Sequence, residues 1–533
     1  MTDEDLTVRR EVPRLDPELV LPPPALLAPP IFEEPATAPP VPALLAAPVL
    51  EELTETSFRL PVIIDEPPAP SPGVKPARVP AGPVKRLPSP LTELVVLGSL
   101  GIAALAAFAG ITWLAAIVVL LLVAAAGLGV LAYQPVLVFC LMGFTLGAAP
   151  NVQTPVLGVS ITFVLSAAMW GALAVMPEVQ HRVNWAAGLS AVLIGLAFFT
   201  FVGNPITGAA VQDFVRWSIT AAAVYPLSVL PARQLARVGR WFVYGCTAAA
   251  AFGIALVAVD RDGSKLDRLT FLGYSADGGN GRFVFGANGN FARLTSTYVD
   301  PNLGGLIMAV GLLLALALLR GRLRVLSVGL LVLAIALTLS RADIGAVAVA
   351  AVLVVLFSGV SGRIRGRLLG LGVLAGTAML ALPAIRSRLT NSFGSNDRGS
   401  SARWEAFEIF PDQMSGHWLL GRGFGAPELV DASAAAATNY VANAPLLTVY
   451  RGGIVVGLAF TVLMLTAALF GWRLMRGSAF EPAAVGAGYL GIMLVALQLD
   501  FPVVTISAAT LAFAILLVFV SRPDAFSDEF TDD

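Results

Sequence analysis

The chain has 533 residues, of which 57% are hydrophobic and only 13% are charged, and its mean hydropathy is +0.80. Soluble domains carry roughly 25% charged residues, so this composition excludes an ordinary soluble protein. The net charge of −1 gives no indication of a nucleic-acid partner. Cys140 and Cys246 lie singly in apolar segments and the chain has two histidines, so a disulfide framework and a histidine-rich metal site are both excluded.

Residues 1–88 are dense in proline. Proline fixes φ and removes a backbone donor, so this stretch is not expected to form long helices or a sheet. We predict a disordered cytoplasmic tail. It acts either as a plain spacer or as a docking ligand for a cytoplasmic partner.

The apolar residues that follow occur in blocks long enough to cross the ~30 Å hydrocarbon core as helices. We therefore expect an all-α fold, a polytopic transmembrane helical bundle of about 12–14 spans within residues 89–522. The predicted spans are 91–109, 112–132, 134–149, 157–176, 185–203, 215–231, 241–259, 303–320, 325–340, 343–358, 368–385, 446–470, 483–499 and 503–520.

The arginine positions predict an orientation, because cytoplasmic loops carry an excess of positive charge. Clusters that begin at Arg233, Arg320, Arg363 and Arg473 fall in alternate connections, whereas the loops at 150–156 and 204–214 hold no lysine or arginine. We expect a bacterial inner-membrane protein with both termini in the cytoplasm, including an acidic C-terminal tail at 523–533. The long segments 260–301 and 386–444 are then extracytoplasmic, and binding and chemistry are expected there.

The first polar motif opens the span after segment 260–301. Asp300 precedes Pro301, the arrangement of a helix N-cap followed by proline at the first helical position. Asp300 and Asn302 would also lie at the outer surface of the membrane. A role in chemistry or substrate binding is therefore the alternative to capping alone.

The second motif, residues 338–343, separates two apolar blocks and leaves no room for a loop. Arg341 is therefore expected at the tip of a helical hairpin at the outer interface. There it either extends to lipid phosphate or faces inward and binds an anionic substrate, since ionisable groups at membrane depth are usually functional.

The third motif lies in segment 386–444 and just after it. It contains Arg403, Glu405, His417, a glycine-rich turn at 421–425, Asn443 and Arg451. The glycine cluster does not follow a strand, so a dinucleotide-binding fingerprint is excluded. The arginines and His417 are also explained as ordinary surface residues.

Residues 338–343, the Arg403-Trp404 pair, the turn at 421–425 and the stretch 443–454 together resemble, in their order, the O-antigen ligase and Wzy-type polymerase superfamily of GT-C-like polytopic glycosyltransferases. The resemblance covers roughly residues 215–470 and is strongest over 295–460. It implies that a glycan is transferred from a polyprenyl diphosphate carrier on the outer leaflet to an acceptor sugar. It further implies inversion of the anomeric carbon without a metal or cofactor.

Arg341 matches the Ser-Arg position of that superfamily and is expected to bind the diphosphate of the donor, since guanidinium stays charged and binds phosphate bidentately. The other expected substrate-binding residues are Arg216, Arg403, Arg451, Asn302 and Asn443.

The chain departs from the superfamily at Ala442, where many members have a histidine. A general base at that position would be lost. His417, Glu405 and Asp300 are then the alternatives for this catalytic role.

These patterns predict a glycosyltransferase of cell-surface polysaccharide biosynthesis, with a polymerase favoured over a ligase because of the missing histidine. Its partners would be the lipid-linked donor, the glycan acceptor and the bilayer. A flippase for lipid-linked oligosaccharides is one alternative, although it should show two similar halves with interrupted helices. A non-catalytic subunit of a surface-polymer assembly complex is the other.

Overall fold

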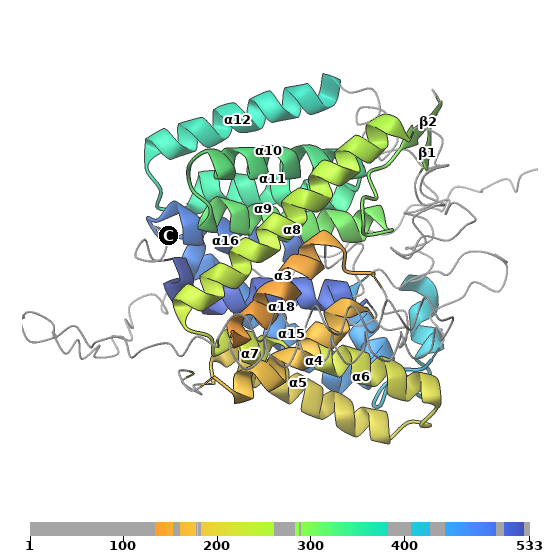
Figure 1. The fold of residues 1–533 in the computed structure, drawn as a ribbon. Coiled ribbons are helices and arrows are strands. Elements are labelled where there is room, and N and C mark those ends of the chain that lie inside the picture. The colour runs from red at the N-terminus through yellow and green to blue at the C-terminus, as the bar shows by residue number, and fades with distance from the viewer. Residues whose placement is uncertain are drawn as a thin grey trace, which may run out of the picture. The chain divides into compact units, whose positions relative to one another are not determined.

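The computed structural model describes residues 134–152, 160–176, 179, 183–260, 283–286, 289–381, 407–426, 443–496 and 506–526 (Figure 1). All of them belong to one compact unit, residues 86–533. The predicted tail at 1–88, the first two predicted spans, Arg403 and Glu405 lie outside the described residues.

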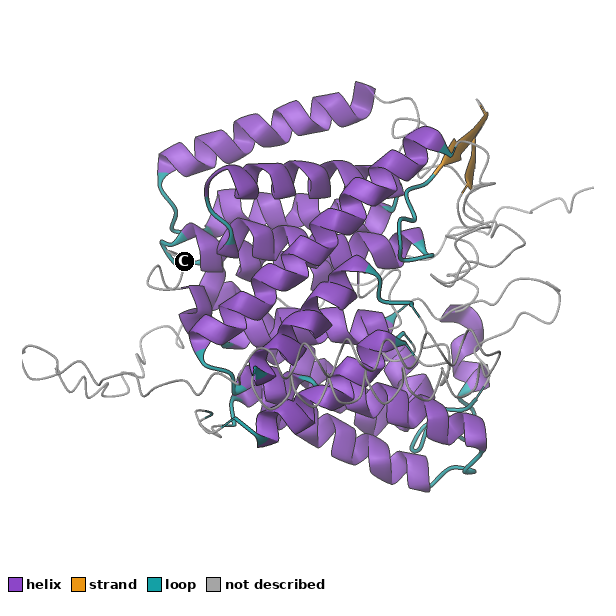
Figure 2. Cartoon of the chain, in the orientation of Figure 1, coloured by secondary structure: helices purple, strands orange, loops and turns teal. Residues whose placement is uncertain are grey.

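Helices make up most of the described chain (Figure 2), and its first part is helical up to residue 259, as predicted. Its helices are α3 (Pro135–Ala148), α4 (Ile161–Ala174), α5 (Trp185–Val202), α6 (Gly208–Ala222), α7 (Val224–Ser228) and α8 (Ala232–Val259). The span predicted at 215–231 is wrong in its bounds. Helix α6 begins seven residues earlier, because Thr207 accepts a hydrogen bond from the Ala210 N–H and caps it.

A short antiparallel hairpin interrupts the helical pattern, with Phe283 opposite Ala292 and Gly286 opposite Gly289. Its strands are β1 (Phe283–Gly286) and β2 (Gly289–Ala292). The all-α prediction missed this hairpin. The helices that follow are α9 (Pro301–Leu318), α10 (Gly321–Thr338), α11 (Arg341–Phe357), α12 (Gly362–Ala381), α15 (Ala444–Met475), α16 (Phe480–Gly491) with the π-turn η4 (Ile492–Ala496), α18 (Ser507–Ser521) and the 3-10 turn η5 (Pro523–Phe526).

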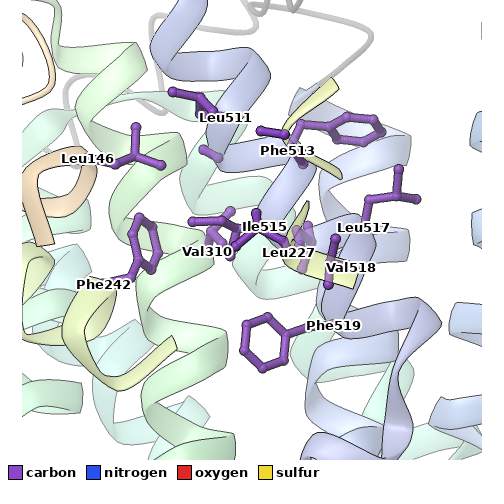
Figure 3. Close-up of a cluster of buried hydrophobic side chains, with 14 of the residues drawn as sticks. Leu146, Leu227, Phe242, Val310, Leu511, Phe513, Ile515, Leu517, Val518 and Phe519 are labelled. Atoms are coloured by element: carbon purple, nitrogen blue, oxygen red, sulfur yellow. The ribbon is translucent and has the colours of Figure 1, made fainter. Parts of the chain in front are cut away.

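Helices α9 and α18 form the centre of the described helices. They are apolar on every side, and helices of this kind are stable only when other helices surround them. Nearly every residue of both is buried. Figure 3 shows the side chains that meet around them, among them Val310 of α9, Ile515 and Phe519 of α18, and Phe242 of α8.

Five described helices are long and apolar enough to cross a membrane: α5, α8, α9, α10 and α15. Within the described residues, helices α5 and α15 also present large apolar side chains that are mostly exposed, such as Phe199 and Leu469. Apolar surface of this extent suits a lipid environment. The structure thus supports a membrane protein of helical architecture.

The junctions between helices gather at two ends of the bundle. At one end, Arg320 Nη1 lies 2.7 Å from Glu481 Oε1, the Gly359 N–H donates to Gly477 O and Arg522 Nη1 donates to Leu230 O. We call this the arginine-rich end. Its arginines include Arg233, Arg320, Arg322, Arg324, Arg363, Arg365, Arg473, Arg476 and Arg522.

The other ends of the same helices meet at the opposite end of the bundle. There Asn151 Nδ2 donates to Tyr298 O at 2.7 Å, and the Leu294 N–H donates to Leu337 O at 2.8 Å. Asn204, just after α5, donates from Nδ2 to Leu420 O at 2.9 Å. The motifs that the sequence singled out near residues 300, 340 and 421 all lie here, which we call the motif end.

Candidate functional site

Asp300 caps α9. Its Oδ1 accepts hydrogen bonds from the N–H groups of Asn302 at 2.7 Å and Leu303 at 2.9 Å, and Pro301 occupies the first helical position. The capping interpretation is therefore confirmed. The Asp300 side chain is also exposed, so its carboxylate can be reached from outside the bundle. Its role as a general base stays a prediction.

Arg293, which follows β2, joins two helix ends. Its Nη2 donates to Asn302 Oδ1 at 2.7 Å and its Nε donates to Thr338 O at 2.8 Å. Thr338 is the last residue of α10, where the backbone carbonyls have no partner within the helix. A cation at this position both satisfies a carbonyl and complements the negative end of the helix dipole.

Arg341 is the first residue of α11 and is half-buried at the motif end. Helix α10 ends at Thr338, so only Leu339 and Ser340 separate the two helices. The prediction of a tight helical hairpin is confirmed. Helix α11 directs the positive end of its dipole toward the same end, where it favours negative charge, and its first turn already contains the carboxylate of Asp343.

Asp343 lies in the first turn of α11 and is fully buried. A Cβ atom at Gly305 would come within 1.9 Å of Asp343 Oδ2. Glycine at position 305 therefore lets α9 pack directly against the carboxylate. This contact fixes α11 relative to α9, and with it the positions of Arg341 and Asn302.

The backbone around these residues is strained. Ser296, Val299 and Leu339 have φ of 52°, 68° and 53°, and they are the non-glycine residues with positive φ in the described chain. Such conformations cost of order 1–3 kcal/mol each and persist only where the surroundings enforce them. Ser296 and Val299 lie between Arg293 and its partner Asn302, and Leu339 follows its partner Thr338. The non-glycine residues with strained backbone in the described chain therefore all lie near Arg293.

Side-chain hydrogen bonds hold the strained segment 296–299 in place. Ser296 Oγ donates to Ala249 O at 2.5 Å, and the Tyr298 hydroxyl donates to Gly147 O at 2.5 Å. Burial raises the pKa of Tyr298 well above its ordinary value, so the hydroxyl stays protonated and keeps this bond. Segment 293–302 is thus a rigid platform beside Arg341.

A second group of predicted residues surrounds the glycine-rich turn. Arg451 in α15 is buried, and its Nη1 donates to Phe424 O at 2.6 Å and to Ala426 O at 2.5 Å. Phe424 packs against Phe214 and Trp217 of α6. Arg451 therefore holds the turn against the bundle with both of these bonds.

Helix α15 is broken at the same place. Gly453 has φ 77° and ψ 177°, a backbone conformation open essentially to glycine alone. The Arg422 N–H donates to Tyr450 O, the Gly423 N–H to Arg451 O and the Ile454 N–H to Trp418 O. The segment 418–423 thus satisfies the backbone groups that the break would leave without partners.

Three further predicted residues lie at the start of α15, in α6 and in segment 407–426. Asn443 caps α15 by accepting from the Leu446 N–H at 3.0 Å. Arg216 lies in the middle of α6 rather than at its end, because that helix starts early. His417 is exposed, and its Nδ1 lies 2.9 Å from Ser415 O. None of these contacts yet assigns a substrate role.

Sequence reasoning missed Arg293 and Asp343. Asp343 lies within the motif 338–343, and a carboxylate two residues after Arg341, between two apolar blocks, could have been predicted to be important. Arg293 carried no such signal, because Thr338, whose carbonyl it binds, lies 45 residues further along the chain. No group of three metal-binding side chains (His, Cys, Asp or Glu) occurs among the described residues.

No family model matches the chain, and no curated protein was found to match it.

Proposed function

We propose that the chain transfers a glycan from a polyprenyl diphosphate carrier to an acceptor sugar on the outer leaflet, as a polysaccharide polymerase or O-antigen-ligase-like enzyme. The observation that supports this most directly is Arg341. Arg341 is half-buried at the first position of α11, three residues after Thr338, whose carbonyl Arg293 binds. It has the charge and the planar donor geometry that a diphosphate needs.

We further propose that the protein resides in a bacterial inner membrane, with about 12–14 spans and the arginine-rich end in the cytoplasm. The positive-inside rule supports this orientation. It would place both termini inside and the motif end on the outer face, within reach of an outer-leaflet lipid. The Pro-rich tail and the long loop would then lie on opposite sides of the membrane.

In the proposed reaction the hydroxyl of the acceptor attacks the anomeric carbon of the donor. The bond from that carbon to the diphosphate breaks, and the lipid diphosphate leaves with the electron pair. The hydroxyl proton passes to a base, and Asp300 is the candidate because it is an exposed carboxylate within segment 293–302. Arg341 would stabilise the charge that develops on the leaving diphosphate.

The test is transfer by the purified chain, reconstituted in lipid with a polyprenyl-diphosphate glycan, and by two variants of Arg341. Lysine keeps the charge but loses the planar fork. One charge-assisted hydrogen bond is worth ~1.5–3 kcal/mol, and ~1.4 kcal/mol is tenfold in rate. We expect Arg341→Lys to lower transfer roughly ten- to hundredfold and Arg341→Ala to abolish it, with insertion unchanged. Near-normal transfer by Arg341→Lys would assign Arg341 to the lipid interface instead.

The interruption of α15 at Gly453 favours a second candidate, a flippase for lipid-linked oligosaccharides, because transporters build their sites from discontinuous helices. The same reconstituted protein separates the two functions. Movement of the donor across the bilayer without transfer would indicate the flippase. Neither activity would favour a non-catalytic subunit of an assembly complex.

A further inference from the structure

We propose that Arg293 is a positioning residue for Arg341: its guanidinium joins the start of α9 to the end of α10 and so fixes the tight turn from which Arg341 extends. This inference rests on the proposed function, in which Arg341 binds a diphosphate. It assigns a role to a residue that no sequence motif indicated.

The geometry of the guanidinium is the first step. Nη2 bonds to Asn302 Oδ1 at 2.7 Å and Nε bonds to Thr338 O at 2.8 Å, from two different atoms of one rigid plane. A lysine has a single flexible nitrogen and cannot reproduce this two-atom bridge. The bridge therefore sets both the distance and the angle between the two helix ends.

The turn beyond Thr338 is the second step. Leu339 has φ 53°, and the Ser340 N–H donates to Thr338 Oγ1 at 3.2 Å. The chain therefore turns sharply, and α11 begins at Arg341, only three residues after the carbonyl that Arg293 binds. The Leu294 N–H, next to Arg293, also donates to Leu337 O. Two successive residues of one segment thus hold two successive carbonyls of α10.

The rigidity of the platform is the third step. Arg293 can position another residue only if the backbone segment that carries Arg293 is itself fixed. Segment 296–299 is held by hydrogen bonds to α3 and α8, through Ala148 O, Gly147 O and Ala249 O. Arg293 therefore extends from a segment that is fixed to α3 and α8, and it can hold the end of α10 in a defined position.

Binding of a polyprenyl diphosphate without a glycan, to the full-length chain in lipid nanodiscs, tests this role without requiring transfer. We expect Arg341→Ala to weaken binding at least tenfold and Arg293→Gln to weaken it about tenfold. Arg293→Lys should behave like Arg293→Gln, since it lacks the two-atom bridge. The matched control is Arg322→Gln, at the exposed opposite end of α10, which should stay within twofold of the unmodified chain.

The double variant separates positioning from a merely structural role. If Arg293 acts through Arg341, adding Arg293→Gln to Arg341→Ala should cost less than threefold more, because the two losses are coupled. Full additivity, or unaltered binding by Arg293→Gln, would overturn the inference while leaving Arg341 and the proposed function standing. Loss of binding that tracks a lowered melting temperature in both Arg293 variants would also overturn it. Tight binding by the unmodified chain without any transfer would contradict the proposed function alone. No binding by the unmodified chain would contradict both the proposed function and the positioning role of Arg293.

Discussion

Arg341 and Arg451 have the same predicted role but differ in burial. Arg341 is half-buried at a helix N-terminus that opens toward the motif end. Arg451 is buried, and Phe424 and Ala426 offer their carbonyls to its Nη1. A charge buried in this way is stabilised by the protein's own acceptors. The two residues therefore call for different tests.

Replacing Arg451 should destabilise the turn at 421–426, because Arg451 binds two of its carbonyls. Hydrogen bonds to a charged group contribute ~1.5–3 kcal/mol each, so we expect Arg451→Ala to lower the free energy of unfolding by about 3 kcal/mol. Thermal unfolding of the purified protein measures this loss. Arg476→Ala, at the exposed far end of the same helix, is the control and should change little. An unchanged melting temperature with lost donor binding would instead return Arg451 to the substrate site.

The sequence predicted the residues whose partners are close along the chain. The Asp300 cap and the Arg341 hairpin follow from two or three neighbouring residues, and the structure confirms both. Arg293 and Asp343 depend on contacts with Thr338 and Gly305, some 40 residues distant in each case. A single sequence carries no signal for such pairs, because nothing in the local pattern indicates which distant helix will lie alongside.

At the scale of elements, the apolar blocks located most described helices to within a few residues, since burial in apolar surroundings is what those blocks reflect. The errors arose where local chemistry decides a boundary. Thr207 starts α6 early, and α8 begins at Ala232, nine residues before the predicted start at 241. Helix α15 extends to Met475, beyond the predicted end at 470, because its last residues pack against α16. The break at Gly453 was not predicted either.

The break in α15 yields a prediction of its own. A Cβ atom at Gly453 would lie 2.0 Å from Leu419 O, and the backbone there has φ 77°. Alanine can relieve neither the contact nor the strain without moving segment 418–423. We expect Gly453→Ala to destabilise the protein by about 3 kcal/mol. Gly329→Ala, in α10 with nothing within 4 Å, is the control and should be neutral or stabilising by roughly 0.5–1 kcal/mol. Equal stability of the two variants would show that the break is not rigid.

At the scale of the whole molecule, charge is distributed unevenly between the two ends of the described bundle. The arginine-rich end joins its helices through pairs such as Arg320 with Glu481, and Arg324 lies 3.6 Å from the same carboxylate. The motif end instead holds the non-glycine residues with positive φ and the exposed Asp300. A membrane would separate these two sets of groups into different compartments, so orientation decides which one can meet an outer-leaflet substrate.

The orientation is open to a direct test with single cysteines at exposed positions of the two ends. Ser415 lies in segment 407–426 at the motif end, and Ser361 lies between α11 and α12 at the arginine-rich end. Both native cysteines are buried, so the unmodified chain should give no background. Because positive charge is retained in the cytoplasm, a membrane-impermeant thiol reagent should label Ser415→Cys in intact cells. It should label Ser361→Cys only after the cells are opened. The reverse pattern would invert the protein in the membrane, place Arg341 on the cytoplasmic face and remove an outer-leaflet donor from its reach.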